Sequence, residues 1–150
     1  MFFEWYDKYQ QDMEKRFLMR AELETHLGDD RFAKHTGITL LTVEPDYALA
    51  RMEIQEFHMN GVDRVHGGAI VTLADYAFAA ASNTEGGITL GINTNVSFFK
   101  SPTGKYLTAE ATAISGPSKV RGYNVDVKDE DGTLIARMSA LGYSKKRHVQ

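Results

Sequence analysis

The sequence contains no cysteine among its 150 residues, and lysine and arginine do not outnumber the acidic residues. Without cysteine the chain can form no disulfide, bind no metal through thiolate and use no cysteine nucleophile. Its formal net charge of −3 gives no general attraction to nucleic acid or to an anionic membrane. No apolar run is long enough to span a bilayer or to form a signal peptide, so we expect a cytoplasmic protein that binds neither nucleic acid nor membrane.

The common signatures of metal- and nucleotide-dependent chemistry are missing too. The five histidines show no paired spacing such as H-E-x-x-H, so we expect no metal site. There is no G-x-S-x-G elbow, P-loop or dinucleotide-binding glycine pattern. The sequence therefore gives little support for a serine hydrolase or a nucleotide-dependent enzyme. We also expect no cofactor.

Residues 67–83, in the middle of the chain, are predicted to form one helix. Alanine is the strongest helix former, and no proline interrupts the segment. Apolar residues at helical spacing cover nearly all of its sides: Ile70, Val71, Leu73, Ala74, Ala77, Phe78, Ala79 and Ala81. We therefore predict a helix buried in the core. Asp75 is its only charged residue, and burying an ionised carboxylate requires a partner or a function.

This helix begins with two glycines, which favours a site for a substrate carbonyl. Gly67 and Gly68 lack a Cβ and let another molecule approach the backbone. The first N–H groups of a helix have no internal acceptor, and they lie at the positive end of the helix dipole. Such donors can form an oxyanion hole. Asn60 and His66, just upstream, could add polar groups to the same place.

The spacing between the glycines and the aspartate has a consequence for assembly. Eight residues separate Gly67 from Asp75, which corresponds to about 12 Å along one helix. The two cannot both contact one reacting carbon. If both act in one site, Asp75 must come from a second copy of the chain whose helix runs antiparallel to the first. The hypothesis therefore predicts a two-fold homodimer with two shared active sites.

Asn60-Gly61, His66-Gly67-Gly68 and Leu73-Ala74-Asp75 together resemble the hotdog-fold acyl-CoA thioesterases of the phenylacetate-degradation type. The resemblance covers about residues 28–144 and includes a later segment, Phe98-Phe99-Lys100-Ser101-Pro102. It implies that the Gly67 N–H donates to the thioester carbonyl, while Asn60 and His66 shape the pocket. It also implies that Asp75 of the partner subunit activates water or attacks directly, and that two dimers pair into a tetramer.

The same resemblance points to further residues that bind the substrate. Gly68 belongs to the glycine pair, and a small polar residue early on the next strand is expected to hold water, with Asn93 preferred to Thr94. A turn at residues 116–119 would meet coenzyme A, so Lys119 and Arg121 are candidates for phosphate contacts. Lys100 and Arg64 are weaker candidates. Coenzyme A is here part of the substrate and not a separate cofactor.

The remaining segments predict an α+β domain. Aromatic residues at three- and four-residue steps, among them Phe2, Tyr6 and Phe17, predict an amphipathic helix over residues 2–26. We take residues 1–27 as this helix and 28–150 as the hotdog domain. The helix packs on the domain, contacts another subunit or covers an acyl pocket. A short helix is expected at residues 31–35. Strands are expected at residues 38–44, 47–54, 88–99, 105–115, 120–128 and 133–143.

Three functions are compatible with these features. The leading one is hydrolysis of an acyl-CoA, with an aromatic acyl group such as phenylacetyl or hydroxyphenylacetyl, or a short to medium aliphatic chain. A hotdog dehydratase acting on 3-hydroxyacyl thioesters is the alternative within the enzymes. A non-catalytic acyl-CoA-binding domain is the alternative outside them. Asp75 occupies the position of the acidic residue in the thioesterases that the sequence resembles, which favours hydrolysis.

Overall fold

The computed structural model describes residues 2–27, 30–84, 87–116 and 118–145. The chain divides into two units, Met1–Asp30 and Arg31–Gln150. The first unit contains the helix α1 (Phe2–Leu27). Several side chains of its predicted aromatic stripe are exposed, among them Tyr6, Tyr9 and Phe17. Residues 28–29, 85–86 and 146–150 lie outside the described residues, as does Pro117 in the turn predicted at residues 116–119.

The second unit contains two α-helices, one 3₁₀ helix and six strands within its described residues. In chain order they are α2 (Arg31–His35), β1 (Ile38–Glu44), β2 (Tyr47–Glu53), η1 (Glu56–His58), α3 (Gly67–Ser82), β3 (Ile88–Phe98), β4 (Tyr106–Ala113), β5 (Val120–Asp129) and β6 (Leu134–Lys145). These bounds confirm the predicted α+β class. Helix η1 was not expected from the sequence.

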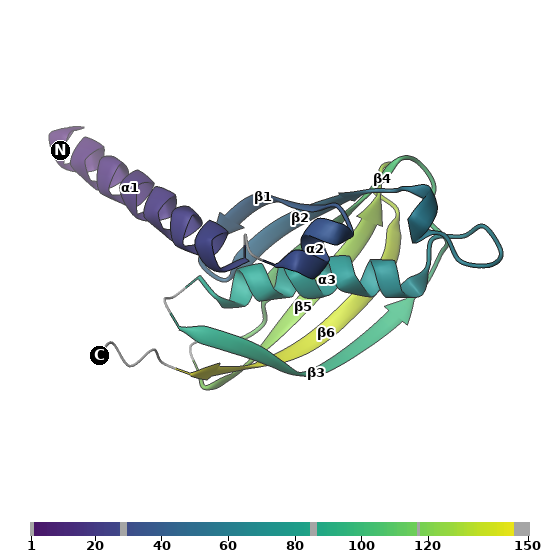
Figure 1. The fold of residues 1–150 in the computed structure, drawn as a ribbon. Helices are drawn as coiled ribbons and strands as arrows, with labels where there is room; N and C mark the ends of the chain where they lie inside the picture. Colours follow the sequence, from purple (N-terminus) through teal and green to yellow (C-terminus); the bar gives the residue numbers. More distant parts are fainter. Residues whose placement is uncertain (1, 28–29, 85–86, 117, 146–150) are drawn as a thin grey trace. The chain divides into compact units, whose positions relative to one another are not determined.

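The six strands form one antiparallel sheet in the order β1-β2-β4-β5-β6-β3. Figure 1 shows α3 lying along one face of this sheet, which curves around it. Strand β3 is an edge strand, although it follows α3 directly in the chain. The connection through α3 therefore carries the chain from β2, near one edge, to β3 at the other.

The core lies between α3 and the inner face of the sheet. Helix α3 packs mainly against β2 and β4, whose inward residues are mostly small. Ala48, Ala50, Ala109 and Ala111 are all fully buried. Because alanine adds only a methyl group, the helix backbone can lie close to these strands. Larger side chains such as Leu73 fill the rest of the core.

One side of α3 is not covered, which corrects the prediction of a helix buried all round. Asp75 and Gly68 are exposed, and Thr72 and Ala79 are only partly buried. These four positions follow one another at three- and four-residue steps, so they form one stripe along the helix. We call Gly68, Thr72, Asp75 and Ala79 the open stripe. Asp75 is thus not a buried charge within a single chain.

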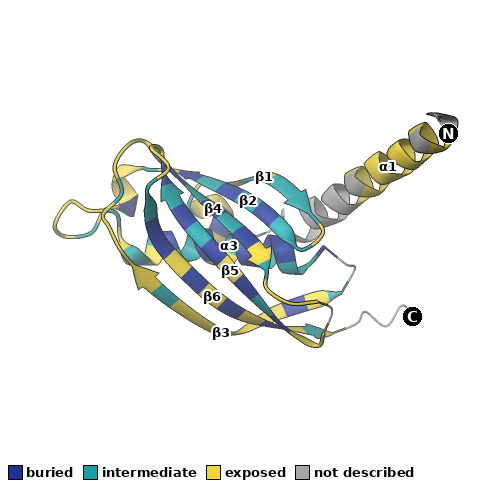
Figure 2. Cartoon of the chain, turned by 180° about the vertical axis from the view of Figure 1, so that it is seen from behind, coloured by how far each residue is buried: buried dark blue, intermediate teal, exposed yellow. Residues whose placement is uncertain are grey.

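Strand β3 is open as well. Nine of its eleven residues are exposed, and among the described residues it pairs only with β6. Figure 2 shows this strand as mostly exposed, whereas the neighbouring strands alternate between buried and exposed residues. A long edge strand of this kind offers its backbone to another chain.

The turn from β5 to β6 is organised by a buried carboxylate. Asp129 is 4% exposed and accepts hydrogen bonds from the backbone N–H groups of Thr103, Asp131 and Thr133 and from the Thr103 hydroxyl. Burial alone would raise the pKa of Asp129, but the bonds donated by Thr103, Thr133 and Asp131 outweigh it and hold the pKa below its usual value. Gly132 completes the turn with a φ of 78°.

Candidate active site

The loop before α3 is held in shape by the side chain of Asn60. Its Oδ1 accepts the N–H groups of Val62 and Arg64, each at 3.0 Å. The backbone closes the same loop, because the Asn60 N–H donates to the Arg64 carbonyl at 2.7 Å and Met59 pairs with Val65. Asn60 therefore fixes the conformation of the segment that leads into the helix.

His66 caps the helix and determines which N–H group remains available. Its Nδ1 accepts the Gly68 N–H at 2.8 Å, and its carbonyl accepts the N–H groups of Ala69 and Ile70. The Gly68 N–H is thus occupied within the chain, and a part for Gly68 in substrate binding stays a prediction. A Cβ on Gly68 would lie 3.0 Å from the His66 Nδ1, so the cap requires a small residue there.

The His66 cap does not bind the N–H of Gly67. Among the described residues of the chain, no group accepts a hydrogen bond from the Gly67 N–H. As the first residue of α3, Gly67 places this N–H at the positive end of the helix. The geometry thus presents one fixed backbone donor at the entrance of the helix.

An open pocket of about 400 Å³ lies at this donor. Helix α3 contributes Gly67 and Ile70, and the preceding loop contributes Arg64 and Val65. The remaining lining residues are the segment Phe98-Phe99-Lys100-Ser101-Pro102. Two motifs thirty residues apart in the sequence thus share one pocket. Its walls are largely apolar, while Arg64 and Lys100 bring two positive charges that have no ion pair within the described chain.

Asp75 does not reach this pocket in the same chain. It lies two helical turns beyond Gly67 on the open stripe, about 12 Å along the helix axis. Its side chain is exposed and is not among the residues that line the pocket. A single chain therefore holds the donor and the carboxylate in separate places.

The two candidates on β3 lie on opposite faces of the sheet. Thr94 pairs with Ala140, which is buried on the face toward α3. Asn93 pairs with the exposed Leu141 and lies on the outer face, because side chains directly opposite each other share a face. A register shift between Gly91 and Asn93 produces this arrangement. The structure thus favours Thr94 over the preferred Asn93 as a residue near the helix.

Arg121 has a structural role, which corrects its prediction as a phosphate contact. It is 6% exposed, and its Nη2 lies 2.6 Å from the Asp46 carboxylate and 3.2 Å from the Ser115 carbonyl. Its guanidinium also lies 5.7 Å from the Tyr123 ring. A guanidinium used in this way is not available to a ligand in solvent.

Lys119 is exposed but remote from the pocket. Its carbonyl accepts the Ser144 N–H, and Ser144 pairs with Thr89 near the start of β3. The pocket lies at the other end of that strand, at Phe98, which is nine residues or roughly 30 Å away. Within one chain, Arg64 and Lys100 line the pocket together with Gly67, whereas Lys119 does not.

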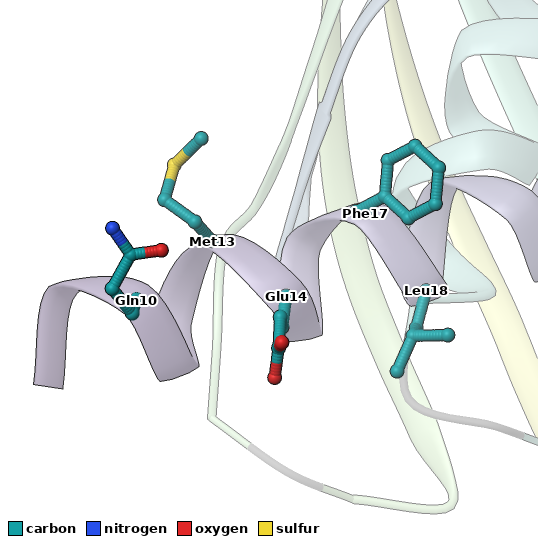
Figure 3. Close-up of a pocket in the computed structure, with 5 residues that line it drawn as sticks. All are labelled: Gln10, Met13, Glu14, Phe17 and Leu18. Atoms are coloured by element: carbon teal, nitrogen blue, oxygen red, sulfur yellow. The ribbon is translucent and has the colours of Figure 1, made fainter. Parts of the chain in front are cut away.

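Helix α1 carries a hollow of about 560 Å³ lined only by its own residues, namely Gln10, Met13, Glu14, Phe17 and Leu18. Figure 3 shows these side chains projecting from the one helix. No second element of the described chain lines this hollow, so polar groups from several elements do not converge there. No group of three or more possible metal-ligating side chains occurs among the described residues. None of the described helices combines the length and apolarity needed to cross a membrane.

Comparison with known proteins places this arrangement in a family. Residues 63–136, which include the helix start, Asp75 and the Phe98–Pro102 segment, match the thioesterase superfamily. A protein of Archaeoglobus fulgidus named "Putative esterase" is 33% identical over 116 residues, which cover 77% of this chain and 75% of that protein. The chain belongs to the thioesterase superfamily. The hotdog resemblance inferred from the sequence is thereby confirmed.

Two further proteins are similar to this hotdog thioesterase in sequence or in fold. The acyl-coenzyme A thioesterase PaaI of Escherichia coli is 27% identical over 109 residues, covering 72% of this chain and 78% of PaaI. The structure of E. coli PaaI superimposes with a TM-score of 0.80 at 22% identity, over 88% of this chain and 94% of PaaI. A mutant of the Thermus thermophilus PaaI gives a TM-score of 0.70 at 27% identity, over 75% and 96% of the two chains.

Proposed function

We propose that this hotdog thioesterase hydrolyses an acyl-CoA to the free acid and coenzyme A. The observation that carries the proposal is the N–H of Gly67, a residue that lines the pocket at the start of α3 and whose N–H has no acceptor in the described chain. A thioester carbonyl placed there would receive this hydrogen bond. The bond strengthens as negative charge develops on the oxygen during attack.

Asp75 would supply the other half of the chemistry. As a general base it takes a proton from water while the water oxygen bonds to the thioester carbon, and the C–S bond then breaks to release CoA thiolate. As a nucleophile it would form a mixed anhydride, which water then opens. A single turnover in ¹⁸O-labelled water separates the two routes by the position of the label: the general-base route places it only in the product acid, whereas a mixed anhydride that water opens at the Asp75 carbonyl carbon leaves it in the Asp75 carboxylate.

A two-fold dimer would bring Asp75 to the pocket of a second chain. Two exposed features support it, namely the edge of β3 and the open stripe on α3. Pairing of two β3 edges would continue the sheet and would place two α3 helices side by side. Gly68, Thr72 and Ala79 carry small side chains, which allow the two helices to approach closely. In an antiparallel pair, each Asp75 would lie near the other chain's Gly67.

We further propose that Lys100 and Arg64 bind the phosphate groups of coenzyme A. Both line the pocket and have no ion-pair partner in the described chain, whereas Arg121 is paired with Asp46 and Lys119 is remote. The apolar walls formed by Phe98 and its neighbours suit the uncharged pantetheine arm and acyl group. Aromatic acyl groups and short to medium aliphatic chains both fit this chemistry. The tetramer and the cytoplasmic location stay predictions.

Release of free thiol from a panel of acyl-CoAs tests the reaction. The chain has no cysteine, so a colorimetric thiol reagent reports only the released coenzyme A. We expect turnover by the wild type and a loss of about a hundredfold or more in Asp75→Asn, which keeps the size of the side chain and removes the base. An Asp75→Asn variant as active as the wild type would refute the assigned role. Binding without release by the wild type would refute hydrolysis.

Mixing two inactive variants tests the shared site. Asp75→Asn and Gly67→Pro each remove one half of the machinery, and the mixed dimer combines one intact site with one doubly defective site. After the two are unfolded and refolded together at equal amounts, half of the dimers are mixed. We therefore expect about a quarter of the wild-type activity. If Gly67 and Asp75 acted within one chain, the mixture would remain inactive.

A further inference from the structure

His58 is a buried polar residue that no step above uses. It ends the 3₁₀ helix η1 and is 3% exposed, although its neighbours Glu56 and Phe57 are both exposed. Its ring lies against the Phe57 ring with the centroids 4.3 Å apart. A buried imidazole normally has hydrogen-bond partners for its nitrogens, so those partners indicate what the residue does.

Both ring nitrogens of His58 bind backbone groups. Nδ1 accepts the Gln55 N–H at 2.9 Å, so this nitrogen carries no proton. The proton of the neutral ring is therefore on Nε2, which donates to the Thr36 carbonyl at 2.9 Å. Thr36 directly follows α2, and its own N–H donates to the Phe32 carbonyl in that helix. The ring thus connects the end of α2 to the segment that leads into the active-site loop.

The backbone of His58 holds the other end of the same loop. Its carbonyl accepts the His66 N–H at 2.8 Å, and the next residues close the loop through the Met59–Val65 bridge. His66 is the cap of α3, and the following peptide group carries the Gly67 N–H. One backbone hydrogen bond therefore connects His58 directly to His66, the cap that precedes the Gly67 N–H.

The rest of this loop has little to hold it in place. Residues 61–64 are all exposed, so the loop buries almost no apolar surface of its own. The Asn60 bonds are made within the loop and fix its shape, but not its position on the domain. Among the described residues, the His58 ring makes the side-chain hydrogen bond that ties the base of this loop to the end of α2, and the Phe57 and His35 rings also approach each other with their centroids 6.4 Å apart. A displacement of about 1 Å in a catalytic donor is enough to cost roughly a hundredfold in rate.

We propose that His58 is a positioning residue for the oxyanion hole. Its neutral imidazole clamps the base of the loop against α2, and the His58 carbonyl passes this constraint through His66 to the Gly67 N–H. The inference rests on the proposed function, since it concerns the same donor. It adds a residue outside the pocket that acts on the chemistry through the backbone.

Three variants test the proposal. His58→Leu fills the space without hydrogen bonds, whereas His58→Gln offers one acceptor and one donor in place of the two ring nitrogens. His35→Gln is the matched control, because this neighbouring histidine is exposed, its ring makes no hydrogen bond within the described chain, and it approaches η1 only through the exposed Phe57 ring at 6.4 Å between centroids. If His58→Leu does not fold, His58→Asn replaces it, since its shorter side chain can accept the Gln55 N–H but does not reach the Thr36 carbonyl.

Two measurements separate positioning from stability. The first is kcat and KM for acyl-CoA hydrolysis, taken well below the melting temperature of the least stable variant. The second is the Gly67 amide peak in an NMR spectrum of protein labelled with ¹⁵N-glycine, assigned through its loss in Gly67→Ala. We expect His58→Leu to lower kcat about a hundredfold with KM within about threefold, and to shift the Gly67 peak. His58→Gln should recover most of the kcat and the peak position, and His35→Gln should match the wild type.

A folded His58→Leu variant whose kcat stays within about threefold of the wild type would overturn the proposal, as would a fall in kcat without a change at the Gly67 peak. Equal loss in His58→Gln and His58→Leu would also overturn it, because hydrogen bonding would then not explain the effect. A wild type that hydrolyses no thioester would refute the proposed function alone. In that case the Gly67 peak in the His58 variants still decides whether the clamp positions the donor.

Discussion

Replacing Gly67 with proline removes the proposed donor while the start of the helix is retained. Proline has no N–H, and it is well tolerated at the first position of a helix, which Gly67 occupies. The residue before a proline must be extended, and His66 already is, with φ −61° and ψ 134°. No hydrogen bond within the described chain is lost, because the Gly67 N–H has no acceptor there.

The effect on rate and the effect on stability should have opposite signs. One oxyanion donor is worth about 2.7–4 kcal/mol in the transition state, so kcat should fall about a hundred- to a thousandfold. Proline in place of glycine restricts the unfolded chain, so we expect the free energy of unfolding to rise by about 0.4–1 kcal/mol. Gly67→Ala is the control, because it keeps the N–H. Its Cβ would meet the Phe98 ring at an ordinary contact distance of 3.4 Å.

The assay is thiol release at saturating acyl-CoA, with the melting temperature of each variant recorded alongside. The reasoning requires Gly67→Pro to be much slower than Gly67→Ala while its melting temperature is equal or higher. If the two variants have kcat values within about threefold of each other, the Gly67 N–H is not the oxyanion donor. If Gly67→Pro is slow but strongly destabilised, the helix start has been disturbed and the assumption about the first helical position is wrong.

Three other predictions concern charged residues. Lys100→Met should raise KM for an acyl-CoA about tenfold and leave KM for the matching acyl-N-acetylcysteamine unchanged, because that thioester has no phosphates. Lys128→Met, on the outer face, should change neither KM, and an equal rise for both thioesters would contradict the phosphate contact. Arg121→Met should lower the free energy of unfolding by about 3 kcal/mol in urea titrations with KM unchanged, because it breaks a largely buried ion pair. A raised KM with unchanged stability would contradict the structural role and indicate that Arg121 contacts the substrate. Asp129→Asn should cost about 2 kcal/mol at pH 7. The native pKa of Asp129 is lowered, so its contribution is complete above the pKa of the unfolded state and is lost as pH falls through the native pKa. The wild type and Asp129→Asn should therefore converge in stability under acid, and a constant gap between them would show that the carboxylate charge is not responsible.

Features that depend on neighbours in the chain could be predicted from the sequence. The spacing of apolar residues and the Gly67-Gly68 pair located α3 almost to the residue, because helix periodicity and capping act over three or four positions. The strand expected at residues 120–128 likewise agrees with β5, Val120–Asp129. The unpaired Gly67 N–H belongs to this class too, because the first N–H of a helix has no acceptor within the helix, and the family motifs contributed the function proposed for it.

Features that depend on distant segments could not be predicted. The open stripe exposes Asp75 because the sheet covers only one side of α3, and no local pattern shows which side that is. Arg121 is held by Asp46, 75 residues away, so its sequence neighbours gave no sign of the ion pair. The face of Asn93 is set by a register shift against β6, and a shift of one residue moves a side chain to the other face.

The sequence by itself determined the elements of this protein and the chemical groups that they carry, because each element depends on short-range backbone and side-chain preferences. The tertiary structure alone decided which groups meet. It placed Lys100 and Arg64 with Gly67 in one pocket, left β3 as an open edge and connected His58 to α2. These outcomes depend on strand order and register, which long-range packing selects among many arrangements that the same local preferences allow.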